Sequence, residues 1–143
     1  MKTKTLIILI GMLFIGVSKI QAQIGIAVAK ENSSAVEWRI SWGKGSAWDC
    51  KMDAKKYLQN KGYKTVYTQD CNTKCGHSIS SGYYVVVKGT YKSYDGNYKT
   101  DYGLGASSSS YSDAKAKAIA NLSTYSCCWK RSSGVSVEKQ GTY

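Results

Sequence analysis

Short apolar runs and runs of alternating apolar and polar residues follow one another twice along this chain of 143 residues. In each half an apolar run comes first, a turn follows, and an aromatic-rich run returns with alternating apolar and polar positions. Alternation with a period of two is typical of a strand with one buried face. The pattern predicts strands at 24–29 and 36–42, then at 83–88 and 98–104, with turns at 32–34 and 95–97.

Each half continues from its second strand into a helix. A Gly-x-Gly sequence ends the strand at 43–45 and again at 103–105, and predicts a sharp backbone turn. Ser46 and Ser110 each begin a capping-box sequence, which marks a helix N-terminus, and Gly62 predicts the end of the first helix. A last strand closes each half, at 64–69 and 135–139. Both predicted helices have an apolar face, made by Ala47, Cys50, Ala54, Tyr57 and Leu58 in the first and by Ala114, Ala118, Leu122 and Tyr125 in the second.

The two halves are copies of one unit. When position 42 is aligned with position 102, Trp42 falls on Tyr102 and the two Gly-x-Gly sequences coincide. This internal repeat predicts an α+β fold of two tandem ββαβ units, at about 23–71 and 82–143, forming an antiparallel sheet with two helices packed on one face. Trp42 and Tyr102 are expected to fill the core between sheet and helix.

The segment 1–22 follows a different pattern. Lys2 and Lys4 precede an apolar stretch at 6–17, and a small residue, Ala22, ends the segment. This is the form of a secretory signal peptide, and the apolar stretch is too short for a membrane span. We therefore expect a signal peptide at 1–22, export to the periplasm or the cell exterior, and one mature domain at 23–143.

The chain is basic, with 20 Lys and Arg against 9 Asp and Glu and a net charge of +11. Removal of segment 1–22, which holds three lysines and no acid, leaves 17 against 9 and a net charge of +8. Such a charge favours an anionic partner, such as an envelope glycan, a lipid headgroup, an acidic protein or nucleic acid. The lysines are scattered from Lys30 to Lys139, so solubility alone is the other interpretation of the charge.

Five cysteines lie in the mature chain, and disulfides are the expected state of cysteines in an exported protein. Because a strand that follows a helix returns to the helix start, we predict a bridge between Cys50 and Cys71. A second bridge would join Cys75 to Cys127 or to Cys128. Those last two are adjacent and are not expected to bond each other, since the ring would strain the peptide between them. The odd cysteine is free, is capped, or joins two chains in a homodimer.

Cys71, Cys75 and His77 form the sharpest candidate for catalysis or metal binding. Two thiolates and an imidazole at this spacing can ligate zinc, and Cys75 with His77 has the residue types of a nucleophile and its base. Zinc requires reduced thiols, whereas export favours disulfides, and no carboxylate or amide is evidently placed to orient the single histidine. We therefore expect no catalytic site, metal or cofactor, with a secreted enzyme or toxin that uses Cys75 and His77 as the alternative.

The aromatic residues are unusual, with 12 Tyr and 4 Trp against one Phe. Tyr and Trp combine an apolar ring with a polar group, which suits wet binding surfaces. Several tyrosines and lysines surround the predicted turn at 95–97, where alternate residues face solvent. The predicted binding residues at this hairpin tip are Tyr91, Lys92, Tyr94, Tyr98 and Lys99. We expect an exported, disulfide-bonded binding module for an anionic or polar partner.

Several local sequences resemble a known family. The order of strand, turn, "WGKG", a helix with "AKKYL" or "AKAKA", and a cysteine-bearing strand is similar to the bacterial domain-of-unknown-function family 4189. The resemblance implies a small exported protein of two halves, with cysteines at helix ends and in the strands that follow. Cys127 and Cys128 match a helix end and Cys71 a strand end, whereas Cys50 lies at a helix start and departs from the pattern. The resemblance implies no activity.

A second, local resemblance concerns nucleic acid. From 48 to 123 the predicted order is helix, three strands and helix, and "YYVVVKG" with "YGLGASSSSYSDAKAKAIANL" is similar to the end of double-stranded-RNA-binding domains. That family holds phosphates with a basic pair at the start of its last helix. Serines and a tyrosine fill those positions here, at 107–112. Nucleic-acid binding is therefore an alternative rather than the expected function.

Overall fold

The computed structural model describes residues 23–71 and 74–143, and the predicted signal peptide at 1–22 lies outside these residues. The first half contains β1 (Gln23–Glu31), β2 (Ser34–Lys44), α2 (Ala47–Asn60) and β3 (Val66–Thr68). The second half contains β4 (Tyr83–Lys92), β5 (Tyr98–Ser107), α3 (Tyr111–Tyr125), a 3-10 turn η2 (Arg131–Ser133) and β6 (Ser136–Thr142). Every predicted strand and helix is present, with most strands a few residues longer than predicted.

Each half builds one three-stranded antiparallel sheet, and the strand order is the same in both. β1 is the central strand of the first sheet, between β2 and β3. β4 is the central strand of the second sheet, between β5 and β6. The hairpin partner thus lies on one side of the central strand, and the strand after the helix lies on the other. The α+β class and the tandem ββαβ repeat are confirmed.

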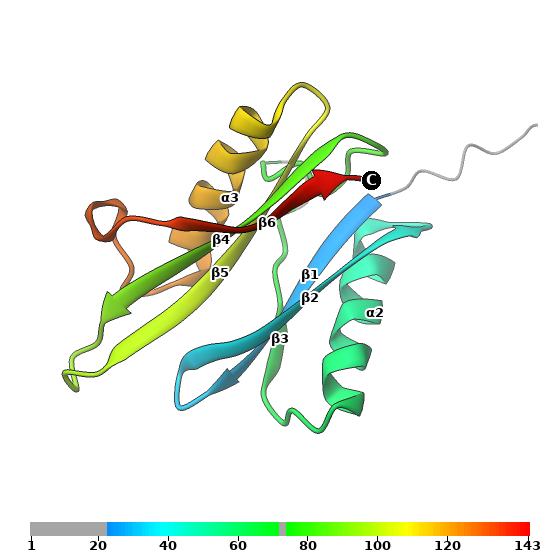
Figure 1. Cartoon of the computed structure of the whole chain (residues 1–143). Helices are drawn as coiled ribbons and strands as arrows, with labels where there is room; N and C mark the ends of the chain where they lie inside the picture. Colours follow the sequence, from blue (N-terminus) through cyan, green and yellow to red (C-terminus); the bar gives the residue numbers. More distant parts are fainter. Residues whose placement is uncertain (1–22, 72–73) are drawn as a thin grey trace, which may run out of the picture.

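The layering differs from the predicted single sheet with both helices on one face, which is a correction. The six described strands form two sheets that pack face to face, and one helix covers the outer face of each (Figure 1). The order of layers is α2, the first sheet, the second sheet and α3. Each repeat therefore contributes a helix and a sheet of its own, and the main core lies between the two sheets.

The apolar run of each central strand explains this layering. In β1, Ile24, Ile26 and Val28 point into the core between the sheets, while Ala27 and Ala29 alternate with them and contact α2. The valines of β4 divide in the same way between the two faces. A strand that is buried on both faces carries a nearly continuous apolar run. Each central strand thus needs two covers, a helix outside and the other sheet inside.

The two hairpins differ in length, so no single constant shift aligns the two halves, which is a further correction. Ile26 of β1 pairs with Ile40, and Val86 of β4 pairs with Leu104. On the first strands position 26 is therefore equivalent to position 86, whereas on the second strands position 40 is equivalent to position 104. The second hairpin is longer, mainly because a five-residue loop at 93–97 replaces the two-residue turn at 32–33.

The aromatic residues shift accordingly. Tyr102 corresponds to Trp38 rather than to Trp42, because each lies opposite the equivalent position of its central strand. The rings of Trp38 and Tyr102 face each other across the two sheets, with centroids 6.1 Å apart. Trp42 stacks on Tyr84 with centroids 6.0 Å apart and remains partly exposed. These rings fill the space between the sheets and not, as predicted, the space between sheet and helix.

The two Gly-x-Gly sequences have different roles. Gly43 lies at the end of β2 with φ of +76°, and supports the predicted turn. Gly103 and Gly105 lie inside β5 instead, and a Cβ at either position would collide with the backbone of α3. They let the helix approach the strand closely, so the turn predicted for 103–105 is wrong.

The helix ends follow the sequence signals. Ser46 Oγ accepts a hydrogen bond from the Asp49 N–H, and Ser110 Oγ accepts one from the Asp113 N–H, both at 3.1 Å. Gly62, with φ of +97°, follows the end of α2 as predicted. No helix in the described part of the chain is long and apolar enough to cross a membrane.

One predicted core residue of α2 lies on the surface. Tyr57 is 41% exposed, and the Arg39 guanidinium stacks on its ring at 4.2 Å from the centroid. Lys51 takes a buried position on this helix and forms an ion pair with Asp70. Burial lowers the pKa of Lys51.

Candidate functional site

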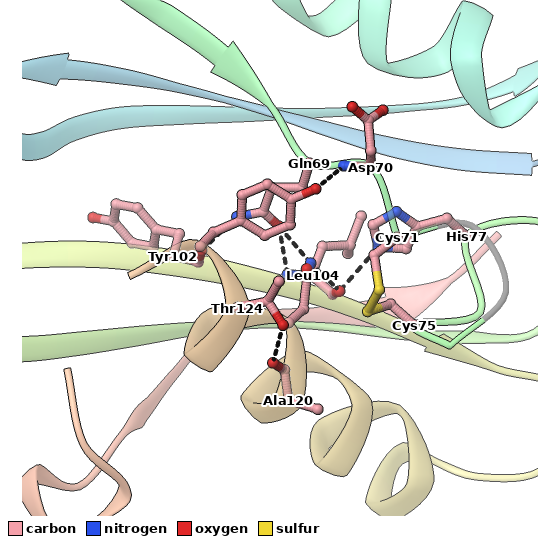
Figure 2. The surroundings of a disulfide bond; sticks show 11 residues. Gln69, Asp70, Cys71, Cys75, His77, Tyr102, Leu104, Ala120 and Thr124 are labelled. Atoms are coloured by element: carbon pink, nitrogen blue, oxygen red, sulfur yellow. Dashed lines mark hydrogen bonds between the residues drawn. A yellow bond between two sulfur atoms is a disulfide. The ribbon is translucent and has the colours of Figure 1, made fainter. Parts of the chain in front are cut away.

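The segment between the two repeats contains the cysteines and the histidine that the sequence marks for chemistry. It passes between the two sheets and bonds to both of them (Figures 1 and 2). The Ile24 N–H donates to the His77 carbonyl at 3.1 Å, and the Gln69 N–H donates to the Ile26 carbonyl at 3.4 Å. On the other side, the Ala106 N–H donates to the Cys75 carbonyl at 2.8 Å. The segment therefore holds the two repeats together.

Side chains from this segment and from α3 cover the free edge of β5. Gln69 Nε2 donates to the Tyr102 carbonyl at 2.6 Å, and Gln69 Oε1 accepts from the Leu104 N–H at 3.3 Å. Asn121 Nδ2 donates to Gln69 Oε1 at 2.5 Å and to the Leu104 carbonyl at 2.9 Å. Both amide side chains are buried. An edge strand with open backbone groups invites aggregation, and these two amides close it.

Cys71 and Cys75 form a disulfide within this segment (Figure 2). Cys75 is 2% exposed, and His77 is also buried. Burial lowers the pKa of His77 to about 4, and its Nε2 lies 2.9 Å from the Leu104 carbonyl. A neutral imidazole that donates to a backbone carbonyl satisfies that carbonyl. The geometry around Cys75 and His77 fits a structural element that seals the junction.

The predicted disulfide pairing is corrected by this bridge. Cys71 is bonded to Cys75, so neither residue is available to Cys50 or to the cysteines after α3. Cys50 is fully buried on the inner face of α2, where its thiol donates to the Gln23 carbonyl at 3.0 Å. Burial raises the pKa of Cys50 and keeps it protonated. The physical reason for the difference is direction: Cys50 points toward β1, whereas the segment after β3 turns toward the second repeat.

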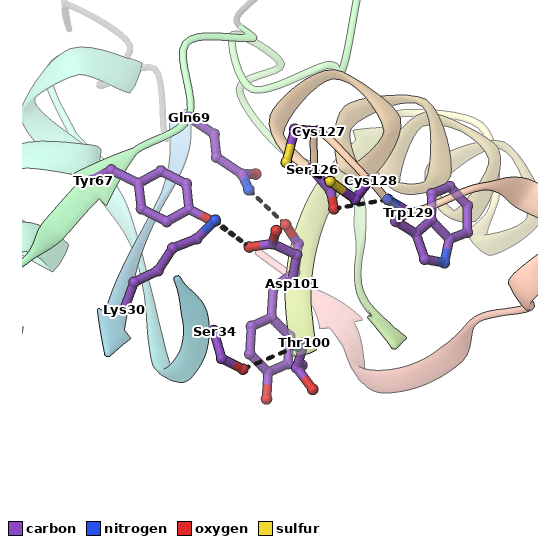
Figure 3. Close-up of polar contacts among 11 residues, drawn as sticks. Lys30, Ser34, Tyr67, Gln69, Thr100, Asp101, Ser126, Cys127, Cys128 and Trp129 are labelled. Atoms are coloured by element: carbon purple, nitrogen blue, oxygen red, sulfur yellow. Dashed lines mark hydrogen bonds and ion pairs between the residues drawn. The ribbon is translucent and has the colours of Figure 1, made fainter. Parts of the chain in front are cut away.

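A partly buried ion pair adds a second connection between the repeats. Lys30 Nζ of β1 lies 2.8 Å from Asp101 Oδ1 of β5, and Tyr67 of β3 donates to the same oxygen at 2.9 Å (Figure 3). Burial and the negative charge of Asp101 raise the pKa of Tyr67. In the described residues, Asp101 Oδ2 is one of two buried side-chain atoms without a hydrogen-bond partner. The Asp101 carboxylate thus ties two strands of the first repeat to the second.

The five predicted binding residues differ in their exposure to solvent. Tyr94 is fully exposed, Tyr98 is 76% exposed, and Lys92 is also on the surface. Tyr91 is only 5% exposed and packs into the core beneath α3, so its predicted role as a binding residue is corrected. Lys99 forms an ion pair with Asp95 at 3.1 Å and is mostly covered. The hairpin tip therefore presents two tyrosines and Lys92.

The tip of the second hairpin faces a hollow of about 240 Å³, here called the tip pocket. Its walls come from the hairpin and from the segment after α3: Lys92, Ser93, Tyr94, Cys127, Cys128, Trp129 and Lys130. The sequence prediction has these cysteines as disulfide partners and places neither them nor Lys130 at the tip. The order of elements could have predicted this placement, because the C-terminus of the helix and the tip of the hairpin lie at the same end of a ββα unit.

Trp129 fixes the segment that carries the two cysteines. Its ring is buried in the core between α3 and the second sheet, and its Nε1 donates to the Gly134 carbonyl at 3.0 Å. Its backbone N–H donates to Ser126 Oγ at 3.3 Å (Figure 3). Beside these anchors, Cys127 is exposed and Cys128 is half-buried, with their Sγ atoms 2.9 Å apart.

The equivalent end of the first repeat has no such chemistry. There a hollow of about 440 Å³ lies between the short turn of the first hairpin and the segment after α2. Its walls are Lys30, Glu31, Asn32, Gly62, Lys64 and Thr65. This wall carries both signs of charge and neither aromatic nor thiol side chains. The two ends thus share a position in the repeat and differ in composition.

No family model, no curated protein and no solved structure matches this chain. The similarity to the domain-of-unknown-function family 4189 and to double-stranded-RNA-binding domains therefore stays a prediction from local sequence.

Proposed function

We propose that the protein is an exported binding module without a catalytic site, and that the tip of its second repeat binds an anionic or polar partner of the envelope or the extracellular space. One observation carries the proposal. Tyr94 and Tyr98 are the two most exposed large hydrophobic side chains of the described residues, and they stand on one hairpin beside a hollow lined by Lys92 and Lys130.

The chemistry of this surface favours an anionic sugar polymer as the first partner to test. Exposed tyrosine rings stack on the apolar faces of sugars and carry a hydroxyl for a hydrogen bond. Lysines that flank the rings attract carboxylate groups along the polymer, in addition to the overall positive charge. Tyr94 and Tyr98 are both exposed on this hairpin, so both rings are accessible to a partner.

The disulfide supports export. A bridge between Cys71 and Cys75 persists in an oxidising compartment and is reduced in most cytosols. The same bond argues against the alternative of a thiol enzyme at Cys75. The Cys75 sulfur is bonded to Cys71 and cannot act as a nucleophile before it is reduced.

The test measures binding of the mature protein to immobilised polygalacturonate, a linear polymer of uronic acid, with polyglutamate as a second probe. We expect binding that weakens as salt rises, since exposed charges are screened. Combined substitution of Tyr94→Ser and Tyr98→Ser should weaken it by about tenfold, or about 1.4 kcal/mol. Trp48→Ser is the matched control, because Trp48 is also exposed but lies at the start of α2.

The outcomes separate the possibilities. Loss of binding in the tyrosine variant but not in the Trp48 variant supports the tip. Equal loss in both contradicts the assignment of the site. Binding to polyglutamate alone would move the partner class from a glycan to an acidic protein.

A further inference from the structure

Cys127 and Cys128 lie side by side in the wall of the tip pocket, with Cys127 exposed and Cys128 half-buried against the core beneath α3. Of the free cysteines described, Cys50 is sealed beneath α2, whereas Cys127 reaches solvent and lines the tip pocket together with Cys128. Trp129 anchors the segment behind them, and the peptide that joins the pair belongs neither to a helix nor to a strand. The pair is therefore accessible on a backbone that no regular element constrains.

The two sulfur atoms already lie close together. Their separation of 2.9 Å is less than about 1 Å longer than a disulfide bond, which measures about 2.05 Å. A bond between neighbouring cysteines is unexpected from sequence because its ring strains the peptide. Strain does not forbid the bond; it raises the reduction potential and makes the bond labile.

We propose that Cys127 and Cys128 form a thiol–disulfide exchange site, which a small disulfide or a protein disulfide oxidises to a vicinal disulfide. The Cys127 thiolate attacks one sulfur of the oxidant R–S–S–R, which gives a mixed disulfide at Cys127 and releases one R–S⁻. The Cys128 thiolate then attacks Cys127 Sγ, forms the Cys127–Cys128 bond and releases the second R–S⁻. In total the two thiols lose two protons and two electrons, and the oxidant becomes two thiols.

The order of attack follows from the surroundings of the two thiols. Cys127 is the more exposed, so an oxidant reaches it first. The hydrogen bond to Cys127, with desolvation and the negative charges of Cys127 and Asp101, raises the pKa of Cys128. Cys128 is half-buried, so its thiol is the less accessible of the two to an oxidant. Cys127 is the attacking thiol and Cys128 the resolving one.

This pairing also accounts for the odd number of cysteines. Cys71 bonds to Cys75 in the junction, and Cys127 would bond to Cys128 at the tip. Cys50 is then left as a single buried thiol, with its hydrogen bond to the Gln23 carbonyl. Both bridges are local, so neither changes the connections between the repeats.

The experiment uses the purified mature protein, reduced mildly and then treated with oxidised glutathione. Remaining thiols are alkylated in denaturant, and a non-reduced peptide map locates each bond. We expect the thiols of Cys127 and Cys128 to disappear together, with a peptide that has lost two hydrogens and carries no lasting glutathione. In Cys128→Ser the mixed disulfide at Cys127 should accumulate to at least a tenfold higher level than in the parent protein.

Cys50→Ser is the matched control and should leave this exchange unchanged. The proposal is overturned if Cys127 and Cys128 keep separate glutathione adducts, if they bond to other cysteines, or if they link two chains. It is also overturned if both thiols remain fully alkylated after treatment. The map reads the thiols directly, so the result does not depend on the proposed binding function.

Discussion

The two repeats share one frame, but their ends differ in what they offer to a partner. In both, the hairpin tip and the C-terminal end of the helix meet at the same end of the unit (Figure 1). In the first repeat a two-residue turn and a short loop leave a hollow of mixed charge. In the second, five hairpin residues and a longer segment after α3 bring Tyr94, two lysines and two cysteines together.

The difference suggests that folding and function are divided between the copies. The parts that are equivalent in both, such as the central strands and the capped helices, build the core. The hairpin insertion lies outside the core between the sheets, and the segment after α3 places Trp129 in the core beneath α3. Loops positioned on a rigid scaffold commonly carry binding residues. Substitutions in the two repeats test this division.

Replacement of Gly103 in the second repeat should cost far more than replacement of Gly43 in the first. Gly103→Ala puts a Cβ into the backbone of α3, and we expect a loss of about 3 kcal/mol of unfolding free energy. Gly43→Ala meets open space and suffers only from its φ of +76°, with an expected loss of about 1 kcal/mol. Urea denaturation of both variants gives the two values. Equal losses would contradict the different roles assigned to the two Gly-x-Gly sequences.

Acid should weaken the junction through His77. Its pKa is lowered to about 4 in the folded protein, so the unfolded state binds the proton more readily. The neutral His77 side chain lets the protein keep its full unfolding free energy above about pH 6.5. As the pH falls from 6.5 toward 4, the unfolding free energy decreases by on the order of 3 kcal/mol. Denaturation at a series of pH values measures it. His77→Gln keeps a donor for the Leu104 carbonyl and should remove this part of the pH dependence; an unchanged profile would contradict the account.

Loss of the Gln69 amide should open the edge of β5. Gln69→Leu removes the partner of the Leu104 N–H and of the Tyr102 carbonyl, and one of the two acceptors of Asn121 Nδ2. We expect a loss of about 2 kcal/mol. Gln59→Leu, the same substitution on the exposed side of α2, is the control and should change stability by less than about 0.5 kcal/mol. Urea denaturation again provides the comparison, and similar losses in both variants would argue against a special role for the junction amide.

The smallest effect concerns the short turn of the first hairpin. Ser33 has φ of +63°, a conformation that glycine adopts without cost. Ser33→Gly should therefore stabilise the protein by less than about 1 kcal/mol. Thermal denaturation would show a slightly higher midpoint, and a lower one would mean that the Ser33 side chain contributes contacts of its own.

Local sequence signals predict the structure correctly where one residue has one local role. The helix caps at Ser46 and Ser110, the stop at Gly62 and the strand pattern depend on neighbouring residues alone. Such signals fail where a residue's role depends on the other repeat or on an insertion. Because the second hairpin is longer, Tyr102 is equivalent to Trp38 and not to Trp42. The apolar runs of β1 and β4 show that both faces of each strand are buried, but not that the second cover is the other sheet.

The candidate site could be predicted only in part for the same reason. Tyr94, Tyr98 and Lys92 lie at the tip as predicted, since the Asp95-Gly96 turn is a local signal. The burial of Tyr91 depends on α3, and the approach of Cys127 and Cys128 to the tip depends on the path of the chain after that helix. The disulfide between Cys71 and Cys75 depends on how the junction turns between the sheets.

The most direct measurement gives the second hairpin the short turn of the first. In this variant, residues 93–97 are replaced by Asn-Ser, the two-residue turn of the first hairpin. The new turn then connects Lys92 and Tyr98, which already pair with each other at the ends of β4 and β5. We expect the unfolding free energy to change by no more than about 1 kcal/mol and binding to polygalacturonate to fall by at least about tenfold. Unchanged binding with the shortened hairpin would contradict the claim that the second repeat carries the binding site.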